Sequence, residues 1–262
     1  MKILGIESAS VTASAALVDG DHVLAEFTTN YQKTHSETLL PMIDEIVRMT
    51  DTELSTLDGI AVSAGPGSFT GLRIGAATGK GLAFALEKPM IAVPTLAAIA
   101  YGAFGSSYLL CPLMDARRGE VYTGLFRFDG ETLVTVQEST AVPLTEEVRI
   151  AEETARALSK EILYLGDGVA VFEAKIREIS TLPPHFAPAP VRFQRGVSVA
   201  ALGERMLAVG QGVSAAEFSP IYLRKSQAER EREEAGLSIA ADTDYPTLDP
   251  VNKIQELGEN QR

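Results

Sequence analysis

Apolar and polar residues alternate in a way that predicts three strands at the start of the chain. Short runs rich in branched apolar side chains cover residues 3–7, 13–18 and 23–28. Asp19-Gly20-Asp21, between the second and third runs, is a hairpin turn signal. A helix should follow, because apolar residues recur at the 3.6-residue spacing, namely Leu39, Leu40, Ile43, Ile46 and Val47. Ser36 is its candidate cap, and Pro41 predicts that the helix begins near this residue or is kinked there.

Further along, the pattern predicts a buried strand, a glycine-rich loop and a long helix. The strand covers residues 59–63, the loop residues 64–69 and the helix residues 70–86. A short strand at 90–93 and a helix that ends near Phe104 should complete this unit, with Thr95 as the cap of the helix.

The second half of the chain repeats the same order of elements. Strand-like runs at 109–115, 120–128 and 133–138 precede a helix at 144–160, a strand at 162–165, the turn Gly166-Asp167-Gly168 and a helix to about Ile179. Two units of strand, strand, strand, helix, strand and helix indicate a duplicated α/β fold, although the units share no visible sequence identity.

The remaining residues predict a connection, a last helix and a tail. Four prolines make residues 181–196 an expected irregular connection before a helix at about 198–209. We therefore predict a first lobe at 1–104, a second lobe at 105–225 and a separate tail at 226–262. The tail holds nine acidic and four basic residues and is expected to be mobile and unnecessary for the core.

Composition fits a globular protein and argues against direct nucleic-acid binding. The 262 residues are 45% hydrophobic and 22% charged. Twenty-three Lys and Arg against 35 Asp and Glu give a net charge of −12. A chain without a basic stripe has little with which to neutralise a row of phosphates, so we expect any role on RNA or DNA to need a partner.

Nothing in the sequence predicts secretion, a membrane span or a disulfide. Cys111 is the only cysteine and sits in an apolar run, so we expect a buried thiol rather than a nucleophile. The run at 70–86 is apolar but contains Arg73 and Lys80, which argues against a membrane helix. The apolar run at the start of the chain is too short for a signal peptide, so we expect a cytoplasmic protein.

The loop Gly65-Pro66-Gly67-Ser68-Phe69-Thr70-Gly71 lies between a strand and a helix and is the best local candidate for chemistry. Such a loop can aim backbone N–H groups at an anion, or it can simply be a tight turn. It fits neither the P-loop nor the dinucleotide fingerprint, because the spacing of its glycines is wrong for both. The tight turn is the favoured interpretation.

Gly71, Gly75 and Gly79 then recur every four residues on one face of the predicted helix. An interior glycine costs about 1 kcal/mol relative to alanine, so the stripe needs a compensating contact. Close approach of another backbone would supply it. That backbone belongs either to a strand or helix of this chain or to the helix of a partner.

Candidate acid–base and metal groups are few. Glu7 and Asp115 end the first strands of the two units and could hold Mg²⁺ through water or position a phosphate. His22, His35 and His185 are widely separated, so no metal site is expected, and His35-Ser36-Glu37 is best explained as a helix start.

Five segments together resemble the TsaB family, also called YeaZ. They are ILGIESAS at 3–10, HSETLLPMI at 35–43, SAGPGSFTGLRIGAATGKGLA at 63–83, PTLAAIA at 94–100 and DARRGEVYTGLF at 115–126. The resemblance covers residues 1–225 and implies the actin-like ATPase (ASKHA) fold of two related lobes, each with a mixed sheet flanked by helices. It leaves Glu7, Ser8 and Asp115 as weak candidates for a vestigial nucleotide site; many relatives carry aspartate where Glu7 stands.

The resemblance also implies a role as a non-catalytic subunit. TsaB proteins bind TsaD, a paralogue that transfers the threonylcarbamoyl group to adenosine 37 of tRNAs reading ANN codons, and TsaE joins that complex. TsaD carries an HxxxH metal motif, whereas here Leu39 stands where the second histidine would fall, so no metal and no catalytic residue are expected. ATP and Mg²⁺ would act only through the complex, and tRNA would be held largely by other subunits.

In the family the helices of the first lobe pack against TsaD or against a second TsaB. The resemblance therefore favours the partner explanation of the glycine stripe. The residues expected at the interface are His35, Leu39, Ile43, Ile46, Gly71, Arg73, Gly75 and Gly79. An autonomous ATPase or small-molecule kinase of the actin-like class is the alternative, motivated by Glu7, Asp115 and the glycine-rich loop, and a peptidase is disfavoured.

Overall fold

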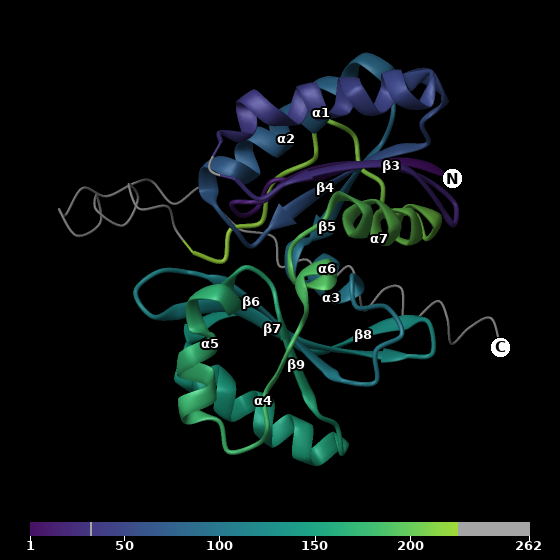
Figure 1. Ribbon diagram of the computed structural model, residues 1–262. Helices are drawn as coiled ribbons and strands as arrows, with labels where there is room; N and C mark the ends of the chain where they lie inside the picture. Colours follow the sequence, from purple (N-terminus) through teal and green to yellow (C-terminus); the bar gives the residue numbers. More distant parts are fainter. Residues whose placement is uncertain (32, 225–262) are drawn as a thin grey trace.

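The computed structural model describes residues 1–31 and 33–224, which form two stacked lobes (Figure 1). The predicted tail at 226–262 lies outside the described residues. The helices are α1 (His35–Thr50), α2 (Phe69–Leu86), α3 (Thr95–Tyr101), α4 (Leu144–Leu158), α5 (Gly168–Ile179), α6 (Ala189–Arg192) and α7 (Gly196–Ala208). The strands are β1 (Lys2–Glu7), β2 (Ala13–Asp19), β3 (His22–Thr29), β4 (Gly59–Gly65), β5 (Met90–Pro94), β6 (Leu109–Asp115), β7 (Glu120–Asp129), β8 (Thr132–Pro143), β9 (Ile162–Leu165) and β10 (His185–Phe186).

The two lobes have matching sheets, as the repeated pattern predicts. The first sheet has the order β3-β2-β1-β4-β5, and the second has β10-β9-β6-β7-β8. In each sheet the first three strands pair antiparallel and the fourth pairs parallel with the first. This duplicated mixed-sheet architecture confirms the predicted actin-like fold.

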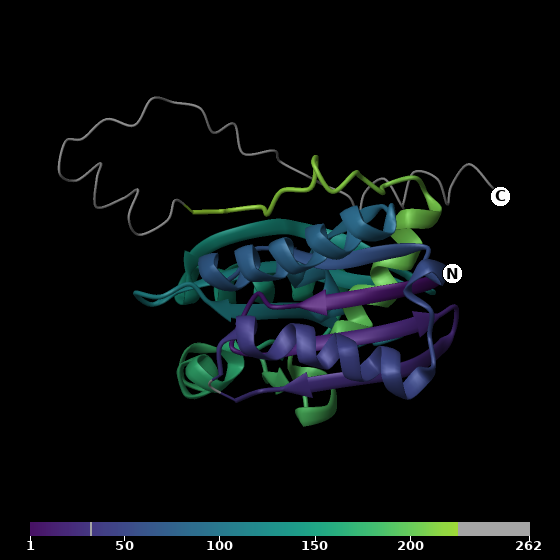
Figure 2. The same cartoon turned by 90° about the horizontal axis from the view of Figure 1, so that it is seen from above.

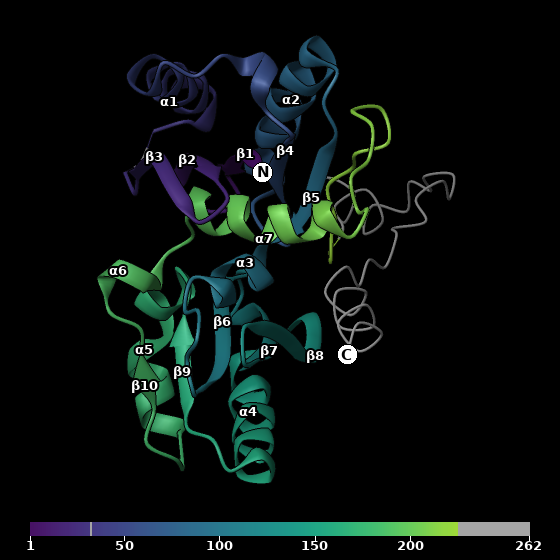
Figure 3. The same cartoon turned by 90° about the vertical axis from the view of Figure 1, so that its right-hand side faces the viewer.

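Helices and sheets alternate as layers. Helices α1 and α2 cover the outer face of the first sheet, while α4 and α5 cover the outer face of the second (Figures 1 and 3). Helices α3 and α7 lie between the sheets. Three buried apolar clusters fill the spaces between these layers.

Helix α7 and the residues after it belong to the first lobe, which corrects the boundary predicted from the sequence. Helix α7 packs on β1, β2 and β4. A Cβ on Gly5 would lie 2.3 Å from the carbonyl oxygen of Gly196, and a Cβ on Gly203 would lie 2.5 Å from Ala61 Cβ. The backbones can meet this closely only because one side carries no side chain. The chain therefore leaves the first lobe, builds the second lobe and returns.

Several predicted ends of elements are also wrong. Helix α1 starts at His35 with Thr34 at the cap position, so Ser36 lies in the first turn, and Pro41 lies inside the helix. Thr95 is the first residue of α3, and its hydroxyl accepts the N–H of Gly65 at 3.2 Å. Helix α3 ends at Tyr101, and the connection at 181–196 contains β10 and α6. The hydroxyl of Thr95 therefore bonds to the end of β4, a partner that only the tertiary fold supplies.

Candidate functional site

A cleft of about 540 Å³ opens between the two lobes. The first lobe contributes the β1–β2 connection, the residue after β3 and the loop before α2, through Ala9, Ser10, Val11, Asn30, Gly67 and Ser68. The second lobe contributes Met114, Asp115, Ala116, Arg117, Tyr122, Asp167, Ala170 and Val171, and Phe193 completes the lining. Ligand sites commonly occupy such clefts between domains, so this is the first place to examine.

Glu7 lies below the cleft and does not line it. Its side chain is 1% exposed and accepts the N–H of Ala9 at 2.6 Å. Desolvation raises the pKa of Glu7 from 4.5 to about 8, so the carboxyl group is mostly protonated at pH 7. Ser8 turns toward α2 rather than toward the cleft, because a Cβ on Gly75 would lie 2.2 Å from Ser8 Oγ. Of the three predicted vestigial residues, two are therefore set back from the cleft.

Asp115 does line the cleft, at the base of the β6–β7 hairpin. One of its oxygens accepts the N–H of Arg117 at 2.7 Å, and the other lies 3.4 Å from the Arg117 guanidinium. The Arg117 side chain is 86% exposed at the mouth of the cleft. The carboxylate and the nearest cation of the cleft are thus already paired with each other.

Asp167, at the start of α5, is the cleft residue that sequence reasoning missed. Burial raises its pKa, and the Nε2 group of Gln194 donates to Oδ1 of Asp167 at 2.7 Å, which opposes that shift. The nearby carboxyl groups of Asp115 and Glu7 interact unfavourably with Asp167. The turn Gly166-Asp167-Gly168 was visible in the sequence, but its approach to Asp115 depends on the parallel pairing of β6 with β9.

The cleft fits a nucleotide with Mg²⁺ only in part. Asp115 and Asp167 are carboxylates of the kind that hold Mg²⁺ directly or through water. Arg117 is the one cationic side chain among the described lining residues, and Asp115 already binds it. The N–H of Ser68 already donates to the carbonyl oxygen of Ala9 at 2.7 Å, so it is not free for a triphosphate, and the lining offers little further positive charge.

His35 has a structural role inside the first lobe, where it bonds to the β1–β2 connection. Its Nε2 donates to the carbonyl oxygen of Ser10 at 2.7 Å, and the ring is buried. Leu39, which takes the place of a second histidine, is 1% exposed and belongs to the apolar core. Among the described residues no group of three His, Cys, Asp or Glu side chains could hold a metal ion.

The glycine stripe of α2 faces this chain's own first sheet, which decides between the two explanations left open by the sequence. A Cβ on Gly71 would lie 2.1 Å from the carbonyl oxygen of Ser8, and one on Gly79 would lie 2.7 Å from Val62. Leu39, Ile43 and Ile46 of α1 are also buried in the same lobe. These six predicted interface residues, Leu39, Ile43, Ile46, Gly71, Gly75 and Gly79, are therefore internal, because the stripe fits the sheet beneath it.

The opposite side of α1 and α2 is exposed and partly apolar. Phe84 of α2 is 82% exposed, and Ala77 and Gly81 lie on the same open side of this helix. We call these three residues the outer helix face. Leu40 and Met49 of α1 are 54% and 62% exposed, but they are nine residues apart and therefore lie on opposite flanks of α1. An exposed apolar patch on a protein surface commonly marks an interaction site. Within the described part of the chain, no helix is long and apolar enough to cross a membrane.

Comparisons with known proteins agree with this architecture. Residues 22–231 match the family model of TsaD, tRNA N6-adenosine threonylcarbamoyltransferase. The tRNA threonylcarbamoyladenosine biosynthesis protein TsaB of Bacillus subtilis is 31% identical over 229 residues, which are 87% of this chain and 96% of that protein. The chain belongs to the TsaB family.

Two further TsaB relatives support the assignment. TsaB of Escherichia coli is 32% identical over 231 residues, 87% of this chain and 96% of its own. The solved structure of YeaZ from Pseudomonas aeruginosa superposes with a TM-score of 0.72 at 27% identity, covering 85% of this chain and 99% of that one. These matches confirm the predicted TsaB family. The names of the Bacillus subtilis and Escherichia coli relatives refer to tRNA threonylcarbamoyladenosine biosynthesis.

Proposed function

We propose that this chain is a non-catalytic subunit that binds a TsaD-type partner and supports transfer of the threonylcarbamoyl group to adenosine 37 of ANN-decoding tRNAs. The observation that carries the proposal is the outer helix face. Phe84 projects from α2 with 82% of its surface exposed, whereas the opposite side of α2 packs against the first sheet. The names of the TsaB relatives support the pathway.

The partner contact differs in its residues from the one expected from the sequence. Phe84, together with the flanking Leu40 and Met49, takes the place of the buried residues, and of the predicted interface residues only Arg73 is exposed. A partner that presents a similar pair of helices would cover these side chains and form a helical bundle. In isolation a second copy of this chain would use the same surface as a homodimer, and TsaE would join the assembled pair in the cytoplasm.

A pair of single substitutions tests the surface. Phe84→Asp should weaken binding to the TsaD counterpart about 30-fold or more, because a buried aromatic anchor is worth at least about 2 kcal/mol at an interface. Affinity is measured by calorimetry and the product by tRNA modification assay. Leu158→Asp is the matched control, since Leu158 is 39% exposed at the end of α4 in the other lobe and does not line the cleft. Equal affinities for both variants, or full modification without this chain, would rule the proposal out.

A second candidate is an autonomous ATPase or small-molecule kinase, and the 540 Å³ cleft with Asp115 and Asp167 favours it. On that proposal the isolated chain binds ATP with Mg²⁺, and Asp115→Asn abolishes binding. Calorimetry on the isolated chain distinguishes the two: ATP binding by the chain alone supports the enzyme, and its absence together with complex formation supports the subunit. ATP and Mg²⁺ would then act only through the complex.

A further inference from the structure

We propose that four arginines along the mouth of the cleft, Arg73, Arg117, Arg118 and Arg224, form a contact surface for the phosphate backbone of RNA. We call this set the basic rim. The inference rests on the proposed role in tRNA modification and deepens it by assigning a tRNA contact to this chain. It also departs from the expectation that other subunits alone would hold the tRNA.

The C-terminal segment places the members of the basic rim next to one another. After α7 the chain runs along α2, as the yellow-green segment of Figure 2 shows, and the N–H of Ile221 donates to the carbonyl oxygen of Ala64 at 2.6 Å. The ring of Tyr222 then packs against Phe69 in a tilted arrangement with ring centroids 4.9 Å apart, and its hydroxyl accepts a hydrogen bond from Arg73 Nε at 3.4 Å. The Arg73 guanidinium lies 3.9 Å from the centre of the Phe69 ring.

Two residues later the same segment reaches the other lobe. Arg224 donates to the carbonyl oxygen of Ala116 at 3.1 Å and pairs with Glu120 at 2.5 Å. Both partners flank the hairpin loop that carries Arg117 and Arg118. The rim therefore begins on α2, passes along residues 222–224 from the first lobe to the second, and ends on the β6–β7 hairpin beside Ala116 and Arg117, which line the cleft.

The hairpin holds its two arginines outward. Arg117 and Arg118 both have left-handed backbones, with φ of 69° and 57°, and Gly119 continues at 77°. Non-glycine residues adopt this conformation at a cost of about 1 kcal/mol or more each. Both side chains are exposed, and Arg118 forms no hydrogen bond or ion pair with any other described residue.

The charge of the rim is not cancelled from below. Asp115 and Glu120 pair with Arg117 and Arg224, which leaves two net positive charges on a chain whose total is −12. Burial raises the pKa of Glu7 to about 8, so this carboxyl group is mostly neutral at pH 7, and burial also raises the pKa of Asp167. Arginine matches phosphate geometry well, and a row of guanidinium groups suits a phosphate chain.

The test compares two double variants in the complex with the TsaD counterpart. Arg117→Gln with Arg118→Gln removes two exposed charges from the rim. Arg149→Gln with Lys175→Gln removes two exposed charges from α4 and α5. Arg149 pairs with Glu153 much as Arg117 pairs with Asp115, which makes the control a close match. Binding of an unmodified tRNA transcript is followed by filter retention over a range of salt concentrations.

If the rim contacts phosphates, its double variant lowers the slope of log affinity against log salt by about 1.4 to 1.8, because each of the two lost phosphate contacts contributes roughly 0.7 to 0.9. The control leaves the slope unchanged. An unchanged slope in the rim variant, or the same decrease in both variants, overturns the proposal. Weaker binding of the rim variant to TsaD without RNA would instead assign the rim to an acidic protein surface.

Failure of the proposed function gives a different result. In that case the wild-type chain forms no complex with TsaD at all. The same transcript is then titrated against the isolated wild-type chain and its rim variant at low salt. RNA binding that depends on Arg117 and Arg118 would keep the rim proposal, and its absence would overturn it.

Discussion

The two lobes share a strand order but hold their outer helices by different means. In the first lobe, α2 lies close to the sheet through three glycines: Gly71 meets the backbone of Ser8, and Gly75 and Gly79 make room for the side chains of Ser8, Val62 and Met90. In the second lobe, α4 keeps its side chains and buries two carboxyl groups, Glu147 and Glu152, against the sheet and the end of α5. Matching topology therefore does not require matching interactions: close backbone contact and hydrogen-bonded burial stabilise the same arrangement.

The strongest test of this contrast fills the glycine stripe. Gly71→Val places a Cβ 2.1 Å from the carbonyl oxygen of Ser8, which the β1–β2 connection holds in place. We expect the free energy of unfolding to fall by at least about 3 kcal/mol, because neither backbone can move without disrupting the sheet. Urea unfolding measures it.

Gly81 of the same helix provides the control. A Cβ at Gly81 meets nothing within 4 Å, so Gly81→Ala should stabilise the protein by about 0.5 to 1 kcal/mol. A similar loss of stability in both variants would mean that helix propensity, and not the close contact, explains the stripe. Gly75→Leu should likewise destabilise the fold itself, so it cannot serve as a clean test of partner binding.

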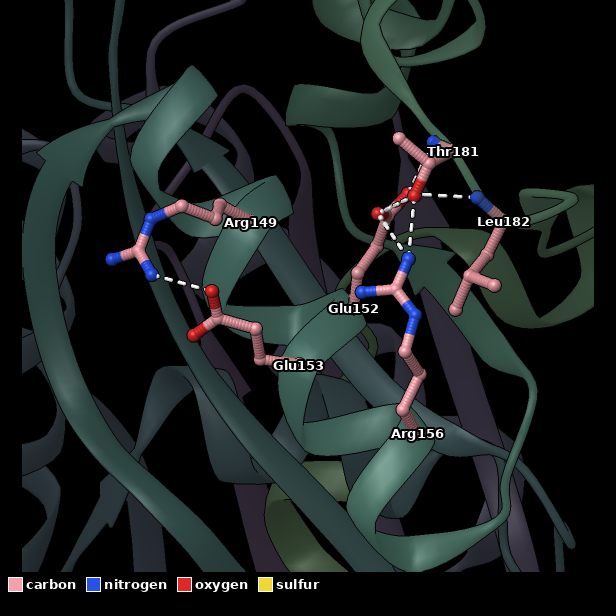
Figure 4. Close-up of polar contacts among 6 residues, drawn as sticks. All are labelled: Arg149, Glu152, Glu153, Arg156, Thr181 and Leu182. Carbon is pink, nitrogen blue, oxygen red and sulfur yellow. Dashed lines mark hydrogen bonds and ion pairs between the residues drawn. The ribbon is translucent and has the colours of Figure 1, made fainter.

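The second prediction concerns Glu152 of the second lobe, which joins α4 to the end of α5 (Figure 4). Its carboxylate accepts the N–H groups of Thr181 at 2.6 Å and Leu182 at 2.9 Å, the Thr181 hydroxyl, and Arg156 at 3.2 Å. Glu152→Ala removes the carboxylate that these donors share and should cost about 2 to 3 kcal/mol in urea unfolding, because hydrogen bonds to a charged group contribute about 1.5 to 3 kcal/mol.

Its neighbour Glu153 is the control, since it forms only an exposed pair with Arg149 at 2.7 Å. Glu153→Ala should change stability by less than about 0.5 kcal/mol. Comparable effects of the two alanine variants would show that the network around Thr181 adds nothing beyond a surface ion pair.

The third and smallest effect concerns pH. Glu147 lies in the core of the second lobe near Cys111 and Gln137, at 3.6 and 3.1 Å, and desolvation raises its pKa from 4.5 to about 7. Below pH 4.5 the group is protonated in both folded and unfolded chains. Between pH 4.5 and 7 only the unfolded chain has lost the proton, so stability falls as pH rises and stays low above 7.

Glu147→Gln should therefore reduce the loss of stability between pH 5 and pH 8 by about 2 kcal/mol. Part of the loss should persist, because Glu7 of the first lobe also has a raised pKa. Urea unfolding at the two pH values measures the difference, with Glu146→Gln, an exposed neighbour, as the control. An identical pH profile in wild type and Glu147→Gln would contradict the assigned cause.

Much of the fold could be predicted from the sequence, and less of the site. Periodicity predicted nearly all the strands and helices, and the order of elements revealed the duplication. Cys111 is buried as expected, and its burial raises the pKa of its thiol. The cleft residue Asp167 was missed, because in the sequence it looks like any carboxylate in a turn. Only the pairing of β9 with β6 brings it close to Asp115.

By itself the sequence determined which residues share one side of each helix, which elements repeat and which family the chain belongs to. Only the tertiary structure decided what each side meets. The small residues of α2 predict a close contact but not its partner. Gly196, Ala200 and Gly203 form a similar stripe on α7, which was not recognised in the sequence although it also packs closely on the first sheet. A helical period fixes directions within a helix, whereas the partner of each face depends on long-range packing, which assigned both stripes to the first sheet and left Phe84 exposed.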